Sequence, residues 1–225
     1  MKLVPQAAPE IQRAPLEDII LDACLLGASA PAAFLADVPT PPNPKAVALA
    51  LENLVSLQAI ELAPSSATAP ALPGGAQLGG WRAAPNASAL RLTPLGVHLG
   101  RLPVDPRVGK LLLLAALTEC LHPILSVAAA LSTSVRVFQA PRDKQNAASE
   151  AQLRAFGAGR SDPLAIAAAF DGWMAAREVT GGRTAEREYC DAHFLSSKAL
   201  REIEAGRKEL LQQLQAVGFV PTPPA

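Results

Sequence analysis

The chain has 225 residues, of which half are apolar and only 4% are aromatic. This length predicts one or two domains, and a core built mainly from leucine and alanine favours closely packed helices. Twenty basic and twenty acidic side chains give a formal net charge of zero. Because an autonomous nucleic-acid-binding protein usually carries a basic surplus, we expect any nucleic-acid contact to be made within a larger assembly.

The cysteines Cys24, Cys120 and Cys190 are odd in number and widely spaced. Such a set does not form a disulfide framework and fits a reducing compartment. No apolar run reaches membrane-spanning length, and the N-terminus lacks the pattern of a signal peptide. We therefore expect a soluble, intracellular chain without a membrane partner, with cytoplasm and nucleus both open.

A polar lead that contains proline occupies residues 1–14, and three helices are predicted after it. The first begins at Pro15, and the second is a short helix beginning near Pro31. The third has Asn43 as its N-cap and a proline at its first helical position. This order of elements is typical of the helical part of a small domain.

Two short strands are predicted next, at residues 60–62 and 90–92. Between them, residues 63–89 are rich in Ala, Pro, Ser and Gly without any periodicity, so we expect a flexible insertion. A turn is predicted at residues 93–96. Three helices followed by a two-stranded hairpin predict a winged helix at residues 15–100, with an enlarged wing tip.

Residues 101–220 are predicted to form a helical bundle, and residues 221–225 a proline-rich tail. The helix that begins near residue 106 is apolar on nearly every side, so we expect it to be central and Leu111 to be buried. Asp105 lies between two prolines just before this helix and is expected to cap its first turn.

Further helices are predicted in the second half of the chain. One carries Phe170 and Trp173, which we expect in the core. The last is capped by Ser196 or Ser197 and runs to about Val217, a length of roughly 30 Å.

Several motifs occur in order along the chain. They are LPVDPR at 102–107, PRDK at 141–144, SD at 161–162 with GW at 172–173, and Cys190 followed by HFLS and Arg207. Together they resemble the helicase-associated region that follows the motor domains of DEAH-box/RHA-type RNA helicases, over about residues 9–220. The resemblance implies a mainly α fold, in which a winged helix with a small β-hairpin wing precedes an α-helical ratchet-like bundle.

The resemblance also implies a function. The chain would be the accessory C-terminal module of an ATP-dependent RNA helicase, closing the RNA channel and gripping single-stranded RNA while motor domains hydrolyse ATP. The sequence contains no Gly-x-x-x-x-Gly-Lys-Ser/Thr loop, so we expect no ATPase activity from it alone. ATP and Mg²⁺ would belong to the motor domains, and no catalytic residue, cofactor or metal is expected in this chain.

The winged helix also permits a DNA-binding interpretation, but its third helix carries one basic residue, Lys45, and no arginine. Helices that read base edges need such side chains, so a protein-docking role is favoured. In the resembled family this module packs against the second motor domain, in cis or trans, and in some members receives a glycine-rich activator. We do not expect the family's oligonucleotide-binding barrel within this sequence, so a domain fragment, a truncated product, a degenerate paralogue and a non-enzymatic adaptor remain open.

Cationic side chains recur on one face of the last predicted helix, although carboxylates beside them leave an ordinary solvated face as the alternative. The free N–H groups at the start of that helix favour a phosphate. Together with the resemblance, this predicts an RNA-binding set of His193, Ser196, Ser197, Lys198 and Arg201, with Arg142 and Lys144 second. Cys190 and His193 do not supply the four ligands of a structural zinc site.

Overall fold

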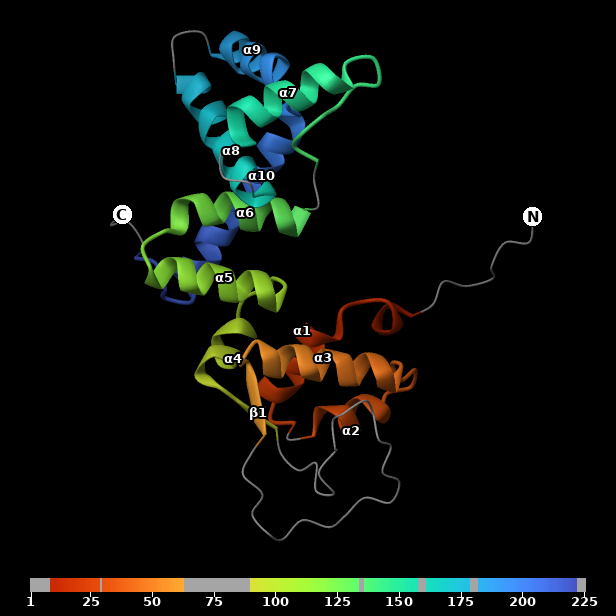
Figure 1. Cartoon of the computed structure of the whole chain (residues 1–225). Coiled ribbons are helices and arrows are strands. Elements are labelled where there is room, and N and C mark those ends of the chain that lie inside the picture. The colour runs from red at the N-terminus through yellow and green to blue at the C-terminus, as the bar shows by residue number, and fades with distance from the viewer. Residues whose placement is uncertain are drawn as a thin grey trace, which may run out of the picture. The chain divides into compact units, whose positions relative to one another are not determined.

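The structure is a computed structural model that describes residues 9–28, 30–62, 90–133, 136–157, 161–178 and 182–221 (Figure 1). These residues are mainly helical and include a two-stranded antiparallel sheet. The chain divides into two compact units, Met1–Lys110 and Leu111–Ala225. The insertion predicted at residues 63–89 lies outside the described residues.

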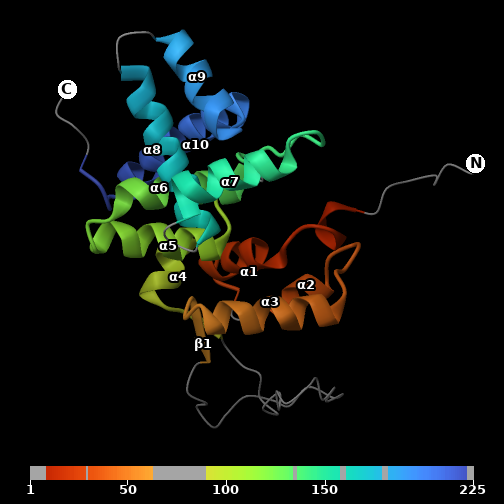
Figure 2. The same ribbon diagram turned by 45° about the horizontal axis from the view of Figure 1, so that its top comes forward.

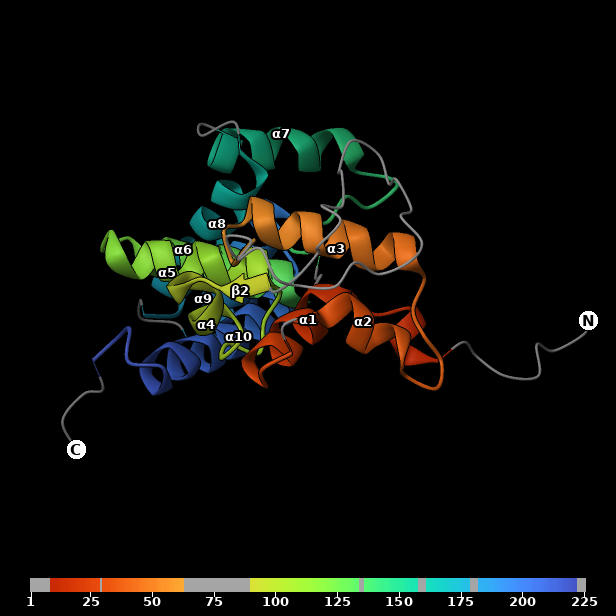
Figure 3. The ribbon, with the colours of Figure 1, turned by 90° about the horizontal axis from the view of Figure 1, so that it is seen from below.

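The first unit begins with a 3₁₀ turn, η1 (Glu10–Gln12), and continues with α1 (Leu16–Leu25), α2 (Pro31–Ala36) and α3 (Pro44–Ser56). The three α-helices pack against one another (Figure 3). Their shared core consists of leucine and isoleucine side chains: Leu16, Ile20, Leu21, Leu35 and Leu54. The predicted cap of α3 is confirmed, because the Asn43 side chain accepts a hydrogen bond from the Lys45 N–H at 2.9 Å.

The sheet pairs β1 (Ile60–Leu62) with β2 (Leu90–Leu92) in antiparallel register, with Ile60 opposite Leu92. Three helices followed by this strand pair give the winged helix that the sequence predicts. Ile60 is buried against the helices, so the sheet closes the core of the unit.

A short helix, α4 (Pro94–Leu99), stands where the sequence predicts only a turn. Thr93 starts this helix: its hydroxyl accepts a hydrogen bond from the Gly96 N–H at 3.0 Å and donates to the Gln58 carbonyl at 2.6 Å. A Cβ added at Gly96 would lie 1.9 Å from the Ala59 carbonyl oxygen, so this backbone approach requires glycine. The Thr-Pro-Leu-Gly sequence is therefore a capped helix start that packs on the residues before β1.

α5 (Pro106–Leu117) is capped as predicted, because Asp105 accepts a hydrogen bond from the Arg107 N–H at 2.8 Å. The prediction that this helix is enclosed on nearly every side is wrong. Leu111 is only partly buried, and Leu114 and Leu117 are exposed. α5 is therefore apolar on nearly every side, although one of its faces is exposed.

The second unit contains α6 (Leu121–Thr133), α7 (Gln145–Phe156), α8 (Asp162–Glu178), α9 (Arg183–His193) and α10 (Ser197–Ala216) (Figure 2). α6 packs against both α8 and α10. At the crossing with α10, a Cβ added at Gly206 would lie 3.2 Å from the Ala129 Cβ. The small residues therefore let the two helix backbones approach closely.

The core of this unit confirms the prediction for α8, since Phe170 and Trp173 are both buried. α10 contributes Leu200, Ile203 and Leu214, all fully buried. Its 20 residues extend over about 30 Å, close to the predicted length. Among the described residues, none of the helices has both the length and the hydrophobicity that a membrane span needs.

Candidate nucleic-acid interface

The start of α10 is built around Ser196, which is the N-cap of the helix. Its hydroxyl accepts a hydrogen bond from the Ala199 N–H at 3.2 Å, and its own N–H donates to the Val137 carbonyl at 2.8 Å. Ser197 is the first helical residue and is partly buried. The Ser196 hydroxyl therefore already satisfies one of the free N–H groups of the first turn.

A short antiparallel junction joins this helix start to the loop before α7. Phe138 and Leu195 form an isolated β-bridge, and the Gln139 N–H donates to the Phe194 carbonyl at 2.8 Å. From α7, the Gln152 side-chain amide donates to the Gln139 carbonyl, also at 2.8 Å. Residues about 55 positions apart in sequence are thus held together by backbone hydrogen bonds.

The loop that leads away from this junction carries Arg142 and Lys144. Both side chains are exposed, and Lys144 occupies the N-cap position of α7 without a side-chain capping bond. Within the described part of the chain, neither residue makes an ion pair. The junction therefore connects the two sets of cationic residues that the sequence predicts separately.

His193, the last residue of α9, packs among aromatic side chains. Its ring stands edge-on to Phe156 and to Tyr189, with ring centres 5.3 and 4.7 Å apart. Its Nδ1 is buried and has no hydrogen-bond partner among the described residues. Burial, followed by the charges of Cys190 and Asp171, raises the pKa of Tyr189 to about 12, which keeps that phenol neutral beside the histidine.

Lys198 and Arg201 lie in different environments although both belong to the first turn and a half of α10. The Lys198 side chain is 88% exposed and pairs loosely with Glu202 at 3.8 Å. The Arg201 Nη2 lies 2.6 Å from Oε1 of Glu186, whose side chain is only 6% exposed. Lys198 is therefore free to move toward a ligand, whereas Arg201 neutralises a buried carboxylate.

The remaining cations of α10 also have partners. Lys208 pairs with Glu204 at 3.3 Å. Arg207 donates to the His122 carbonyl at 2.6 Å and to the buried Ser126 hydroxyl, and it lies over the Phe170 ring at 4.7 Å. Burial lowers the pKa of Arg207 from its ordinary value. Arg207 therefore attaches α10 to α6 and α8.

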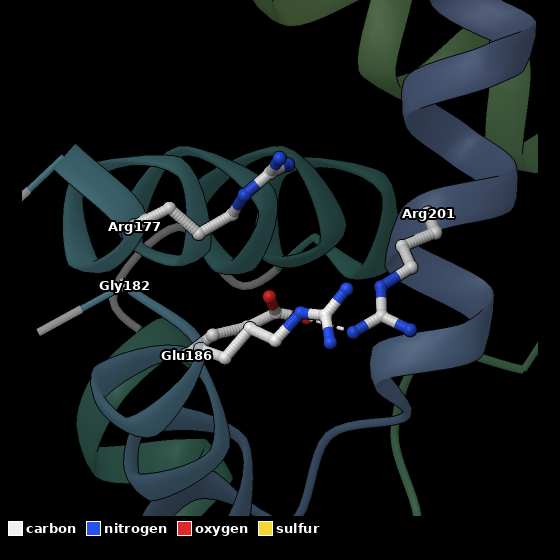
Figure 4. Close-up of a pocket in the computed structure, with 5 residues that line it drawn as sticks. Arg177, Gly182, Glu186 and Arg201 are labelled. Carbon is white, nitrogen blue, oxygen red and sulfur yellow. Dashed lines mark hydrogen bonds and ion pairs between the residues drawn. The ribbon is translucent and has the colours of Figure 1, made fainter.

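A pocket of about 720 Å³ lies beside Arg201 and is lined by Arg177, Gly182, Arg183, Glu186 and Arg201 (Figure 4). Of the four charged residues among these, sequence reasoning named only Arg201 and missed Arg177, Arg183 and Glu186. They come from α8 and α9 and show no common periodicity with the stripe on α10. Only the packing of these helices brings them together.

The sequence is similar to known proteins over most of its length. The family described as "Helicase associated domain (HA2), ratchet-like" matches residues 105–180. The ATP-dependent DNA/RNA helicase DHX36 of Homo sapiens and the DExH-box ATP-dependent RNA helicase DExH1 of Arabidopsis thaliana are each 34% identical over 212 residues, or 94% of this chain. The DExH-box ATP-dependent RNA helicase DExH3 of Arabidopsis thaliana is 30% identical over the same share.

The family match lies over the end of the first unit and much of the second, and the relatives' matches extend over nearly the whole chain. The chain belongs to the helicase-associated region of the DEAH-box RNA helicases. It spans less than a fifth of the length of these relatives, between 15% and 18%.

Proposed function

We propose that the chain is the accessory module of a DEAH/RHA-type ATP-dependent RNA helicase. It closes the RNA channel and grips single-stranded RNA while motor domains, in cis or in trans, hydrolyse ATP. The observation that carries the proposal is the junction between residues 137–139 and 194–196, from which exposed cationic side chains extend on both sides. Contacts of this kind address the phosphate backbone, so binding has little base preference and falls steeply with salt.

The first unit would dock protein. Large apolar side chains are exposed on it, including Leu26 at 88% and Phe34 at 52%. Exposed apolar groups of this size suit a protein contact better than a phosphate backbone. A motor domain is the partner that the proposal assigns to the unit, and a glycine-rich activator segment is a second one.

The test is binding of a single-stranded RNA oligonucleotide, measured by fluorescence anisotropy at two salt concentrations. Lys144→Glu combined with Lys198→Glu should weaken binding at least tenfold, because two exposed cations are replaced by anions. Arg201→Glu is unsuitable, since it would place a second carboxylate against the buried Glu186. Lys45→Glu, an exposed charge reversal on α3, is the matched control and should leave RNA binding unchanged.

A non-enzymatic adaptor that only docks proteins is the second candidate. The pairing of Lys198, Arg201 and Lys208 with carboxylates favours it, because paired cations attract a phosphate less strongly. If the Lys144→Glu, Lys198→Glu double variant binds RNA as tightly as the Lys45→Glu control, the RNA-gripping role is wrong and the adaptor role is favoured.

A further inference from the structure

The pocket beside Arg201 has a composition unlike that of the surrounding surface. Three guanidinium groups line it, and they come from three different helices: Arg177 from α8, Arg183 from α9 and Arg201 from α10. Figure 4 shows Arg177 and Arg201 on separate helices, with the Glu186 carboxylate directed toward the Arg201 guanidinium. Arginines gathered from separate helices are held together only by the fold.

Two of these arginines are held in place by partners that leave donors unused. Arg201 is fixed by the buried Glu186 at 2.6 Å. Arg177 donates to Glu204 at 2.8 Å and stacks over the Trp173 ring at 4.5 Å. A guanidinium has five N–H donors, so each retains several for a further acceptor. Immobilised donors bind a ligand at a lower entropic cost than mobile ones.

Arg183 differs from these two arginines. It is exposed at the first position of α9, and within the described residues it makes no ion pair. Three arginines and one glutamate line the pocket, so its lining carries a net positive charge, to which Arg183 contributes without an ion-pair partner among the described residues. The first-turn N–H groups of α9 beside it also lack intrahelical acceptors. This combination favours an anion.

The geometry distinguishes between anions. A carboxylate presents two oxygens in one plane and is satisfied by a single guanidinium fork. A phosphate presents oxygens in several directions and can accept from guanidinium groups that arrive from different helices. A pocket of about 720 Å³ also has room for the substituents that a phosphodiester carries on both sides.

We propose that this pocket binds a phosphate group, with Arg183 as its principal ligand and Arg177 and Arg201 as preorganised donors. For a phosphate supplied by an RNA strand, the proposal rests on the RNA-gripping function above. For a free phosphate, the proposal does not depend on the RNA-gripping function. In both cases the binding chemistry is the same, and Glu186 weakens it by its charge while holding Arg201 in position.

The experiment titrates the full ¹⁵N-labelled chain with inorganic pyrophosphate and, separately, with a ten-nucleotide single-stranded RNA. The backbone amide of Gly182 reports on the pocket. Arg183→Ala should weaken both titrations roughly five- to tenfold, since it removes the unpaired charge. Glu186→Gln keeps an acceptor for Arg201 but removes a negative charge, and should tighten both by roughly fivefold. Opposite changes from two neighbouring residues are not expected of a merely structural role.

Arg187→Ala is the matched control. It removes the same charge from the same helix, at an exposed position that does not line the pocket, and should change either affinity less than twofold. Thermal melting of each variant confirms that it folds. If Gly182 does not shift with either ligand, or if Arg183→Ala and Arg187→Ala behave alike, the proposal is overturned.

The titrations with pyrophosphate and with RNA distinguish the two possible sources of the phosphate, a free anion and an RNA strand. Pyrophosphate binding that depends on Arg183, without a matching RNA effect, supports the pocket as a site for a free phosphate and removes RNA as its source. RNA binding that depends on Lys144 and Lys198 but not on Arg183 leaves the proposed function intact and overturns the pocket. A poly-glutamate peptide is the third titrant, and tighter binding of it than of either phosphate ligand would overturn the proposal in favour of an acidic protein partner.

Discussion

The two units of the chain join their helices by different means. In the first unit several joints are made at backbone carbonyls: the Thr93 hydroxyl donates to Gln58, the Lys110 ammonium to Leu57, and Gly96 lies against Ala59. In the second unit the joints are arginine side chains, with Arg177, Arg201 and Arg207 each linking α10 to another helix. Both units therefore contain close backbone contacts, and the second adds charged side chains between its helices that a ligand can also contact.

The largest effect is expected at Gly96. In Gly96→Ala the new methyl group would overlap the Ala59 carbonyl, which accepts a hydrogen bond from the Thr93 N–H and is held in place by it. We expect a loss of about 3 kcal/mol in the free energy of unfolding. Hydrogen exchange on peptides from residues 9–62 measures this loss.

Gly100→Ala is the control for that substitution. The nearest atom to its added Cβ is the end of the Leu25 side chain, which can change its rotamer. Its cost should stay below about 1 kcal/mol. Equal losses at the two glycines would contradict the carbonyl contact as the reason.

Arg207→Ala should have the next largest effect, now in the second unit. The substitution removes the donor to the fully buried Ser126 hydroxyl and the packing over Phe170, at a cost of about 2 kcal/mol. Its neighbour Lys208 is exposed and pairs only with Glu204, so Lys208→Ala should cost less than about 0.5 kcal/mol. Denaturant unfolding, followed by tryptophan fluorescence, measures the free energy of unfolding of both variants.

A smaller effect is expected at Ser196, where a role in capping α10 can be distinguished from a role in binding a phosphate. Ser196→Ala should destabilise the chain by about 1 kcal/mol through loss of the α10 cap. Ser196→Asp retains a good N-cap, so stability should return, but its charge should repel a phosphate at the helix start and weaken RNA binding. If Ser196→Asp binds RNA like the unsubstituted chain, the strand does not pass this helix start.

The smallest effect concerns pH and tests whether charge matters in the first unit. Burial, followed by repulsion from Asp105, Asp22 and Glu17, raises the pKa of Asp18 from 3.8 to about 6. The folded state then holds this proton more tightly than the unfolded state, so the stability present below pH 4 is lost as pH rises to about 6. Asp18→Asn should therefore stabilise the chain at pH 7.

The gain should be below about 1 kcal/mol, because Asp18 is exposed enough for solvent to screen it. It should vanish at pH 4, where the native carboxyl is already protonated. Glu61→Gln, which removes one negative charge from an exposed position on β1, is the control for the loss of charge. Thermal melts at the two pH values measure both variants.

The sequence predicts the elements whose signals are local. Asn43, Asp105 and Ser196 mark helix starts through short-range hydrogen bonds, and two short apolar segments indicate the strand pair, whose register the structure adds. The start of α4 was missed because Thr93-Pro94 resembles a turn, and its helical conformation depends on contacts with residues 58 and 59.

The candidate site was predictable only in part. Lys198 and Arg201 appear together in the periodicity of one helix, but the sequence does not show that Arg201 faces a buried carboxylate. Glu186 and Arg183 belong to another helix, and their approach to Arg201 is a consequence of how α8, α9 and α10 pack. Such relations have no signature in a single sequence.

The close crossing of α6 and α10 at Gly206 has a mechanical consequence. Within 4 Å of a Cβ built at Gly206 lies only Ala129, so this crossing would be the fulcrum if α10 rocked, with arms of about 12 Å to Lys198 and about 15 Å to Ala216. A rotation of about 5° at the fulcrum would move either end by about 1 Å, in opposite directions. A larger residue at position 206 would shift the pivot, and so change how far one end travels when the other is pushed.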